Sequence, residues 1–130
     1  MDKMKDVALL AGRVLLALMF VMAGWSKIGG YAGTQGYMEA MGVPGFMLPL
    51  VILLELGGGL AVVLGLFTRS LSVLLAGFTL MAAFIFHYQP AEQMQMLMFM
   101  KNVSVAGGFL ALVAAGAGAF SVDARLGKNW

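Results

Sequence analysis

The sequence predicts an all-α integral membrane protein, a four-helix bundle with a short interfacial helix between its first two spans. Hydrophobic residues make up 62% of the 130-residue chain, whereas soluble domains contain about 45–50%. Charged residues make up only 11%, less than half the usual share. The apolar residues gather in stretches close to the ~20 residues that cross the ~30 Å hydrocarbon core. We therefore expect one domain over residues 1–130, with spans at about 7–28, 46–67, 71–88 and 94–120.

Charge and cysteine content exclude several functional classes. The net charge is +2 and the lysines and arginines form no basic tract, so nucleic acid is not an expected partner. The chain has no cysteine, which removes disulfides, thiolate catalysis, cysteine-ligated metals and self-contained dithiol redox chemistry. The partner that this composition indicates is the lipid bilayer.

The first predicted span begins like a signal peptide, with lysines before an apolar run. That run is too long for a signal peptide and no small-residue cleavage site closes it, so we interpret residues 7–28 as a membrane-spanning helix. Arg13 interrupts the span near its start. Trp25 and Lys27 lie near its end, where an aromatic ring and a lysine suit the boundary between membrane and water.

The connection that follows, residues 29–42, is polar and rich in glycine. Thr34 has the side chain of an N-cap, and an apolar face formed by Tyr37 and two methionines follows it. Gly42 suits the left-handed residue that ends a helix, and Pro44 restarts the chain. We expect a short interfacial helix here, and the alternative is a lid over a functional site.

The second and third spans are joined by a predicted tight turn at residues 68–70. Pro49 falls in the first turn of the second span, where its missing N–H does little harm. The third span carries no charge until His87, and Pro90 ends it.

The fourth span has an ambiguous start, at Pro90 or only after Lys101, and it ends near Phe120. Four spans place both termini on one side of the membrane. The other side has only two basic residues, Lys27 and Lys101. Because cytoplasmic loops carry the excess of basic residues, we expect both termini to lie in the cytoplasm. The basic residues on the terminal side are Lys3, Lys5, Arg69, Arg125 and Lys128, with Arg13 close by.

Glu55 lies near the middle of the second span, where inserting a carboxylate costs about 2.5–3.5 kcal/mol. At ~1.5 Å of rise per residue, Glu55 is roughly 20 Å and Arg13 roughly 10 Å from the cytoplasmic edge. Side chains lean toward the N-terminus of their own helix, so these two lean apart. We therefore expect Arg13 to extend to the cytoplasmic interface rather than to pair with Glu55.

The outer half of the bundle offers Glu55 better partners. Lys27 and His87 close helices that run outward, so both lean back into the membrane. We predict that Glu55 lies within direct or one-water reach of Lys101 or His87. Simpler roles stay open: Glu55 as a structural ion pair, Lys27 as an interfacial anchor and His87 as a boundary residue. The predicted polar cluster consists of Glu55, Lys27, His87, Lys101 and Asn102.

Two stripes of small residues predict close helix packing. They consist of Gly57, Ala61 and Gly65 in the second span, and of Gly107, Ala111, Ala115 and Ala119 in the fourth.

Methionines alternate between Met94 and Met100 in the stretch MQMLMFM. Thioethers bind Cu(I), so a copper site with His87 is one alternative. Alternate residues spread around a helix axis, however, which favours a flexible apolar entry to the membrane. We expect no metal site.

Three stretches carry a resemblance to a known family: GWSKIGGYAGTQGYMEAMGVPGFMLPLVILLELGGGLAVVLGLFTR, AGFTLMAAFIFH and MFMKNVSVAGGFL. Through them the chain resembles the DoxX family of small membrane proteins. This resemblance implies four transmembrane helices and a bacterial inner membrane. Members of the family are associated with quinone-linked sulfur oxidation and with membrane oxidoreductase complexes, often as subunits. Because this chain has no cysteine, electron transfer would need a bound quinone or the redox centre of a partner.

Two functions follow from the resemblance and the polar cluster. The first is a quinone-linked membrane oxidoreductase subunit, in which the cluster supplies hydrogen bonds and a proton route and Trp25 or Tyr31 packs on the quinone ring. Its partners are the quinone, or another hydrophobic small molecule, and a redox protein. The alternative is a non-enzymatic membrane scaffold, or a small-molecule binder or exporter that uses the same cavity. The residues expected to bind the ligand are Glu55, Lys101, His87, Lys27, Asn102, Trp25 and Tyr31.

Overall fold

A computed structural model, which describes residues 3–130, contains four apolar helical segments long enough to cross a bilayer. These spans are Lys3–Gly29, Gly45–Leu64, Thr68–His87 and Gln93–Ala115, which confirms the predicted architecture. The helices are α1 (Lys3–Gly29), α2 (Tyr31–Ala40), α3 (Leu48–Ile52), α4 (Gly59–Leu64), α5 (Thr68–Ala82), α6 (Gln93–Ala115) and α7 (Val122–Leu126). Shorter turns are the 3-10 turn η1 (Gly45–Met47) and the π-helical turns η2 (Leu53–Gly58) and η3 (Ala83–His87).

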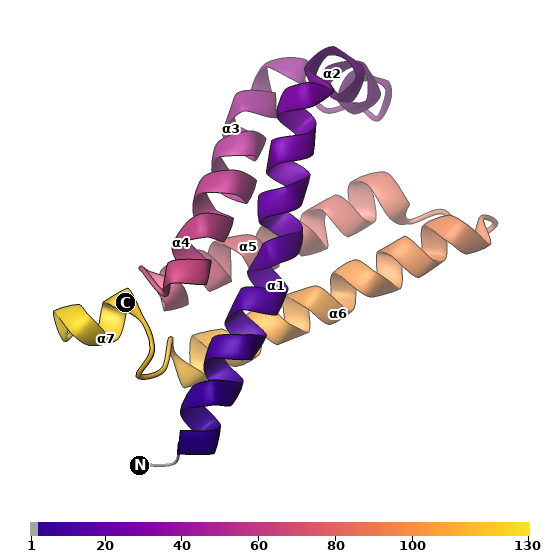
Figure 1. The fold of residues 1–130 in the computed structure, drawn as a ribbon. Helices are drawn as coiled ribbons and strands as arrows, with labels where there is room; N and C mark the ends of the chain where they lie inside the picture. Colours follow the sequence, from indigo (N-terminus) through magenta and orange to yellow (C-terminus); the bar gives the residue numbers. More distant parts are fainter. Residues whose placement is uncertain (1–2) are drawn as a thin grey trace.

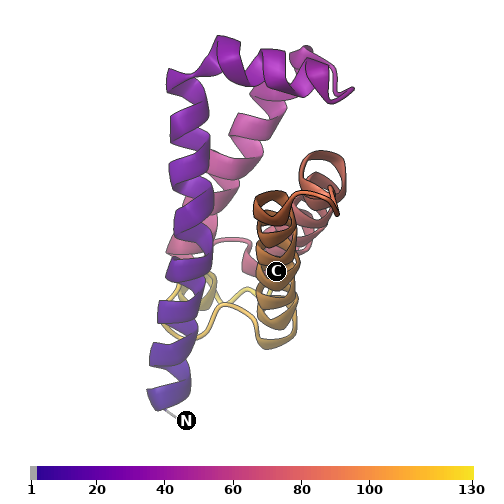
Figure 2. The ribbon, with the colours of Figure 1, turned by 90° about the vertical axis from the view of Figure 1, so that its right-hand side faces the viewer.

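The four spans form two antiparallel hairpins (Figure 1). The first hairpin pairs α1 with the second span, and the second pairs α5 and η3 with α6. The hairpins cross each other near the end that carries α7 and separate toward the end that carries α2 (Figures 1 and 2). Where they cross, Phe20 of α1 meets Phe109 of α6 edge-on, with ring centroids 5.5 Å apart. The buried core therefore lies in one half of the bundle, around Ala17, Val62, Leu75, Ala76, Ala106 and Leu112.

Glycines allow α1 to pack closely against the second span. A Cβ added at Gly24 would lie 2.8 Å from the backbone nitrogen of Leu56, and one at Gly59 would lie 3.1 Å from the backbone nitrogen of Val21. The sequence predicts that the stripe of Gly57, Ala61 and Gly65 packs closely against another helix. This prediction is wrong for Gly57, which is exposed. The π-helical turn η2 adds residues to the turn, so the buried face is no longer where α-helical spacing puts it.

The predicted stripe on the fourth span does not pack against another part of the described chain. Its members Gly107, Ala111, Ala115 and Ala119 are all exposed. In α6 the buried face instead carries Asn102, Ala106, Phe109 and Leu112.

The short helix predicted between the first two spans is α2, which lies across the end of the first hairpin (Figure 2). Gly30 occupies the N-cap position and Thr34 lies inside the helix, so the predicted capping role of Thr34 is wrong. Gly42 adopts the left-handed conformation (φ 86°) as expected. Gln35 Nε2 donates to the carbonyl oxygen of Gly45 at 3.2 Å, which ties α2 to the start of the second span.

The turn between the second and third spans lies earlier than predicted, at residues 65–67 instead of 68–70. Gly65 and Phe67 both have left-handed backbones, with φ of 77° and 54°. The Asp123 carboxylate accepts from the backbone N–H of Phe67 at 2.9 Å and of Thr68 at 3.0 Å. A side chain distant in sequence thus caps α5.

The fourth span begins at Gln93, after Pro90, and it ends at Ala115 rather than near Phe120. Gly116 (φ 79°) and Gly118 (φ 85°) turn the chain out of the helix. The segment that follows crosses the shared end of the hairpins and forms α7.

Arg13 holds this returning segment in place. Its guanidinium donates to the carbonyl oxygens of Ala117 at 2.5 Å, Phe120 at 2.8 Å and Val63 at 3.3 Å. The residue is only 1% exposed, so the expectation that it reaches the interface is wrong. Backbone carbonyls thus accept from both terminal nitrogens of the guanidinium inside the protein. The expectation that Arg13 does not pair with Glu55 is confirmed.

Candidate functional site: a cavity between the hairpins

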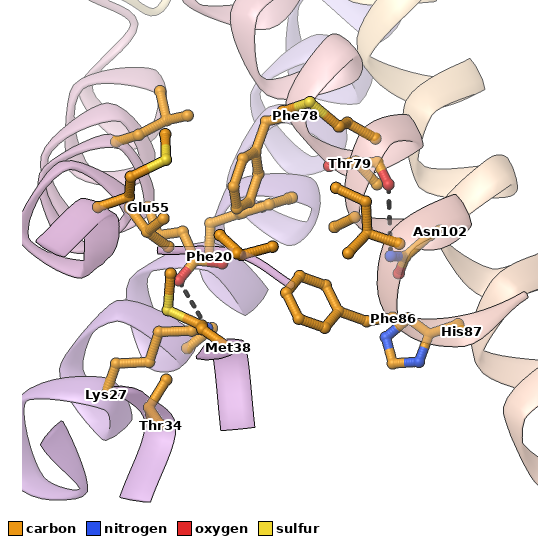
Figure 3. A pocket seen from close by; sticks show the side chains of 18 of the residues that line it. Phe20, Lys27, Thr34, Met38, Glu55, Phe78, Thr79, Phe86, His87 and Asn102 are labelled. Carbon is orange, nitrogen blue, oxygen red and sulfur yellow. Dashed lines mark hydrogen bonds and ion pairs between the residues drawn. The ribbon is translucent and has the colours of Figure 1, made fainter. Parts of the chain in front are cut away.

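A cavity of about 510 Å³ lies between the two hairpins (Figure 3). Its walls come from α1, α2, the second span, α5, η3 and α6, and most of the lining side chains are apolar. The polar side chains are few, and they come from both hairpins. They belong to Lys27, Thr34, Glu55, Thr79, His87, Lys101 and Asn102.

Glu55 is the acidic group of this cavity, and it sits in the π-helical turn η2. The residue is 5% exposed. Lys27 Nζ, from the last turn of α1, lies 2.7 Å from Glu55 Oε1. These two atoms carry opposite charges and form an ion pair. The Lys27 side chain is 27% exposed, so the pair connects a buried carboxylate to a more accessible ammonium.

The prediction is that Glu55 lies within direct or one-water reach of Lys101 or His87. In the described chain the ion pair of Glu55 is with Lys27, and Lys101 forms none with it. The reason is the separation of the hairpins. Lys27 lies on α1, which packs against η2, whereas Lys101 lies on α6 in the other hairpin. Lys101 is exposed and reaches the cavity from that side. The predicted polar residues therefore share one cavity, but they do not form one contiguous cluster.

The opposite wall carries two polar contacts. Asn102 Nδ2 donates to the carbonyl oxygen of Thr79 at 3.4 Å, across the cavity from the ion pair in Figure 3. His87, the last residue of the π-helical turn η3, joins its Nδ1 to Gln95 Oε1 at 2.8 Å. An amide oxygen only accepts hydrogen bonds, so with this amide orientation Nδ1 carries the proton and Nε2 of the neutral ring is an acceptor.

Each wall thus has a titratable side chain in a π-helical turn or at its end, Glu55 in η2 and His87 in η3. Such turns are rare in proteins overall, and those that occur are often found at functional sites. The sequence does not reveal them, because a π-helical turn has no distinct residue pattern.

The aromatic rings of the cavity are not the predicted ones. Trp25 is 72% exposed, and neither Trp25 nor Tyr31 lines the cavity. Tyr37 of α2 and Phe86 of η3 line it instead, and they stack with centroids 5.4 Å apart. This stack joins the two hairpins at their separated end. The signal for Tyr37 was its place on the apolar face of the interfacial helix.

The methionine-rich stretch does not gather into one site. Met98 lines the cavity, whereas Met94 and Met100 are exposed. Within residues 3–130, no group of three or more histidine, cysteine, aspartate and glutamate side chains is arranged to hold a metal ion.

Comparison with known proteins places the chain in a family. The DoxX family model matches residues 8–88. Inner membrane protein YqjF of Escherichia coli strain K12 is 58% identical over 130 residues, which is 100% of each chain. Inner membrane protein YphA of the same strain is 40% identical over 128 residues, 93% of this chain and 91% of that protein. The protein named "Putative oxidoreductase CatD" of Bacillus subtilis strain 168 is 38% identical over 85 residues, 65% of this chain and 63% of that protein. No solved structure matches the chain.

The inner-membrane relatives and the four apolar helices make the chain a multi-pass inner-membrane protein. The family model covers more than half of the chain, and the YqjF match extends over all of it. The chain therefore belongs to the DoxX family.

Proposed function

We propose that the cavity between the hairpins binds a quinone and that the chain is the quinone-binding subunit of a membrane oxidoreductase. The observation that carries this proposal is the cavity itself: an apolar space among membrane spans, with charged and amide side chains on its walls. Its volume of about 510 Å³ lies within the ~300–1,000 Å³ of small-molecule sites. Because the hairpins separate within the spans, a ligand dissolved in the bilayer can enter from the side.

The polar residues of the cavity can form hydrogen bonds with both the oxidised quinone and the reduced quinol. Lys101 and Asn102 are donors for the carbonyl oxygens of a quinone. The Nε2 of neutral His87 is an acceptor for the hydroxyl of a quinol. Tyr37 and Phe86 supply flat apolar surface beside these groups.

Glu55 and Lys27 are the groups that can exchange protons on the other wall. Their ion pair connects a buried carboxylate to a side chain with access to the molecular surface. A carboxylate held by an ammonium can receive a proton from it and pass that proton into the cavity.

A bound quinone supplies the redox chemistry by taking up two electrons and two protons. The electrons come from a redox partner protein, because this chain has no cysteine to form a dithiol couple. The name printed for one relative, "Putative oxidoreductase CatD", supports this class of activity.

The test is quinone binding by the purified protein in a mild detergent. Organic extraction and mass spectrometry should recover quinone with the wild-type protein. A short-chain quinone should also quench tyrosine and tryptophan fluorescence in a saturable titration. Lys101→Met should weaken this binding roughly tenfold, by loss of one hydrogen bond from a charged donor. Lys5→Met is the matched control, because Lys5 is exposed at the N-terminal end of α1 and does not line the cavity. This variant should bind quinone as the wild type does.

Absence of both recovered quinone and saturable quenching would contradict the proposal. The same result together with a stoichiometric protein partner would favour a non-enzymatic scaffold. Recovery of a different apolar molecule, again sensitive to Lys101→Met, would favour a small-molecule binder or exporter.

A further inference from the structure

A second, smaller recess lies at the opposite end of the bundle from the large cavity. Its volume is about 130 Å³, and it is formed where the start of α5, the end of α6 and the segment around α7 meet. Unlike the large cavity, whose lining is mostly apolar, it has polar side chains over much of its wall. The charged residues that line it are Arg69, Lys128 and Asp123.

Arg69 has an unused hydrogen-bond donor at this recess. Its Nη2 donates to the carbonyl oxygen of Ala114 at 3.3 Å. Its Nε is buried and has no hydrogen-bond partner within the described residues. Buried donors are nearly always paired in proteins, so this nitrogen is available to an acceptor that binds in the recess.

The backbone leaves room for this guanidinium. Gly116 has a left-handed backbone, and a Cβ there would lie 3.2 Å from Arg69 Nη2 and 3.3 Å from Nε. A side chain at this position would crowd the guanidinium and would also strain the backbone. Glycine therefore keeps the donor face of Arg69 against the recess.

Asp123 does not satisfy Arg69. Its Oδ1 accepts from the backbone N–H of Phe67 at 2.9 Å and from Trp130 Nε1 at 2.8 Å. Its Oδ2 accepts from the backbone N–H of Thr68 at 3.0 Å. Three donors thus hold this carboxylate in its capping role.

The second cation lies beside an aromatic residue. Lys128 Nζ is 5.5 Å from the centre of the Trp130 ring, which stacks on Phe67. Tryptophan and lysine are typical of the level of lipid headgroups. The recess is at the ends of α5 and α6, so it lies at a membrane boundary whichever way the chain is oriented.

We propose that this recess binds a phosphate group, with Arg69 as the principal donor and Lys128 as the second cation. Basic recesses between helix ends at a membrane surface are typical sites for anionic lipid headgroups. Its volume equals that of roughly four waters, enough to hold a phosphate group. The phosphate can belong to a phospholipid, whose chains stay outside along α5 and α6, or to inorganic phosphate. This inference is independent of the ligand in the large cavity.

The experiment measures thermal unfolding of the full chain in a maltoside detergent, which itself contains no phosphate. Phosphatidylglycerol is titrated in one arm and inorganic phosphate in the other. Diacylglycerol with the same acyl chains is the lipid control. We expect saturable stabilisation by at least one phosphate probe and none by diacylglycerol. A response to phosphatidylglycerol alone identifies a lipid site, and a response to both probes identifies a site for phosphate itself.

The variants test whether the recess is responsible. Arg69→Gln should weaken the affinity roughly tenfold, through loss of charge-assisted hydrogen bonds. Lys128→Gln, at an exposed position, should weaken it by a smaller factor and keeps the test available if Arg69→Gln unfolds the protein. Arg125→Gln removes the same charge from exposed α7 outside the recess and should leave affinity within about twofold. Equal losses for Arg125→Gln and Lys128→Gln would overturn the proposal, because they would indicate general charge attraction. No stabilisation of the wild type by either probe would overturn it as well.

Discussion

Lys27 Nζ lies 2.7 Å from Glu55 Oε1, which joins the last turn of α1 to the π-helical turn of the second span. We expect Lys27→Met to destabilise the protein more than Glu55→Gln, because Glu55 is buried and the Lys27 side chain is 27% exposed. The double variant should cost less than the sum of the single changes, with a coupling free energy of about 1 kcal/mol or more. Unfolding by denaturant in detergent micelles measures all the free energies.

The control for this cycle pairs Glu55→Gln with Lys101→Met. Lys101 makes no ion pair with Glu55 in the described chain, so the two changes should add to within about 0.5 kcal/mol. Strong coupling to Lys101 and none to Lys27 would show that the partners are assigned wrongly.

Close packing of α1 on the second span predicts a position-dependent effect of adding one methyl group. Gly24→Ala places a Cβ 2.8 Å from the backbone nitrogen of Leu56, and we expect a loss of about 1–3 kcal/mol of unfolding free energy. Gly57→Ala is the matched control, because its Cβ would meet only Leu53 of its own helix, at 3.5 Å. Gly57→Ala should be neutral or slightly stabilising, since alanine favours helix. Equal melting temperatures for the two variants would contradict the packing described.

The hydrogen bonds of Arg13 predict that this one side chain holds the segment after α6 in its position. Arg13→Met leaves the carbonyl oxygens of Ala117 and Phe120 without their donor, and we expect a loss of roughly 2–4 kcal/mol. Arg13→Lys should recover only part of this loss, because an ammonium lacks the planar fork that reaches several carbonyls. The measurements are thermal unfolding and the rate of proteolysis within residues 116–121. Wild-type proteolysis of Arg13→Met would refute the proposed role.

Membrane orientation is the fourth prediction, and it rests on the excess of basic residues on the terminal side. Single cysteines are introduced at Ser70 and at Gln89, both exposed and at opposite ends of the third span. The chain has no other cysteine, so labelling reports only these sites. A membrane-impermeant maleimide should label the Gln89 variant in intact cells and the Ser70 variant only after lysis. The reverse pattern would place both termini outside.

The number of spans was predictable because hydropathy depends on composition over ~20 residues and tolerates small errors in bounds. The short helix α2 was predictable for a related reason, since glycines at its two ends isolate it. Contacts between distant segments were not. Asp123 caps α5 and Arg13 binds carbonyls beyond α6, and no local pattern connects these positions.

The site was predictable in its residues more than in its geometry. The residues that depth along each helix predicts to gather all line one cavity, from two walls: Glu55, Lys27, His87, Lys101 and Asn102. Depth could not rank Lys27 above Lys101 as the partner, because that choice depends on which helices pack together and which separate. Regular α-helical spacing also failed to predict the buried face of the second span, since η2 changes the angular position of every residue after Glu55.

The two hairpins cross at the Phe20–Phe109 contact, so a change in their crossing angle moves the separated ends of both. The end of α1 at Gly29 lies about nine residues beyond Phe20, roughly 14 Å at ~1.5 Å per residue, so a rotation of about 5° about this contact displaces that end by roughly 1 Å. The separated tips move most, and the Tyr37–Phe86 stack is what spans them. The distance between the two hairpins at the cavity therefore depends on the angle at which they cross in the core.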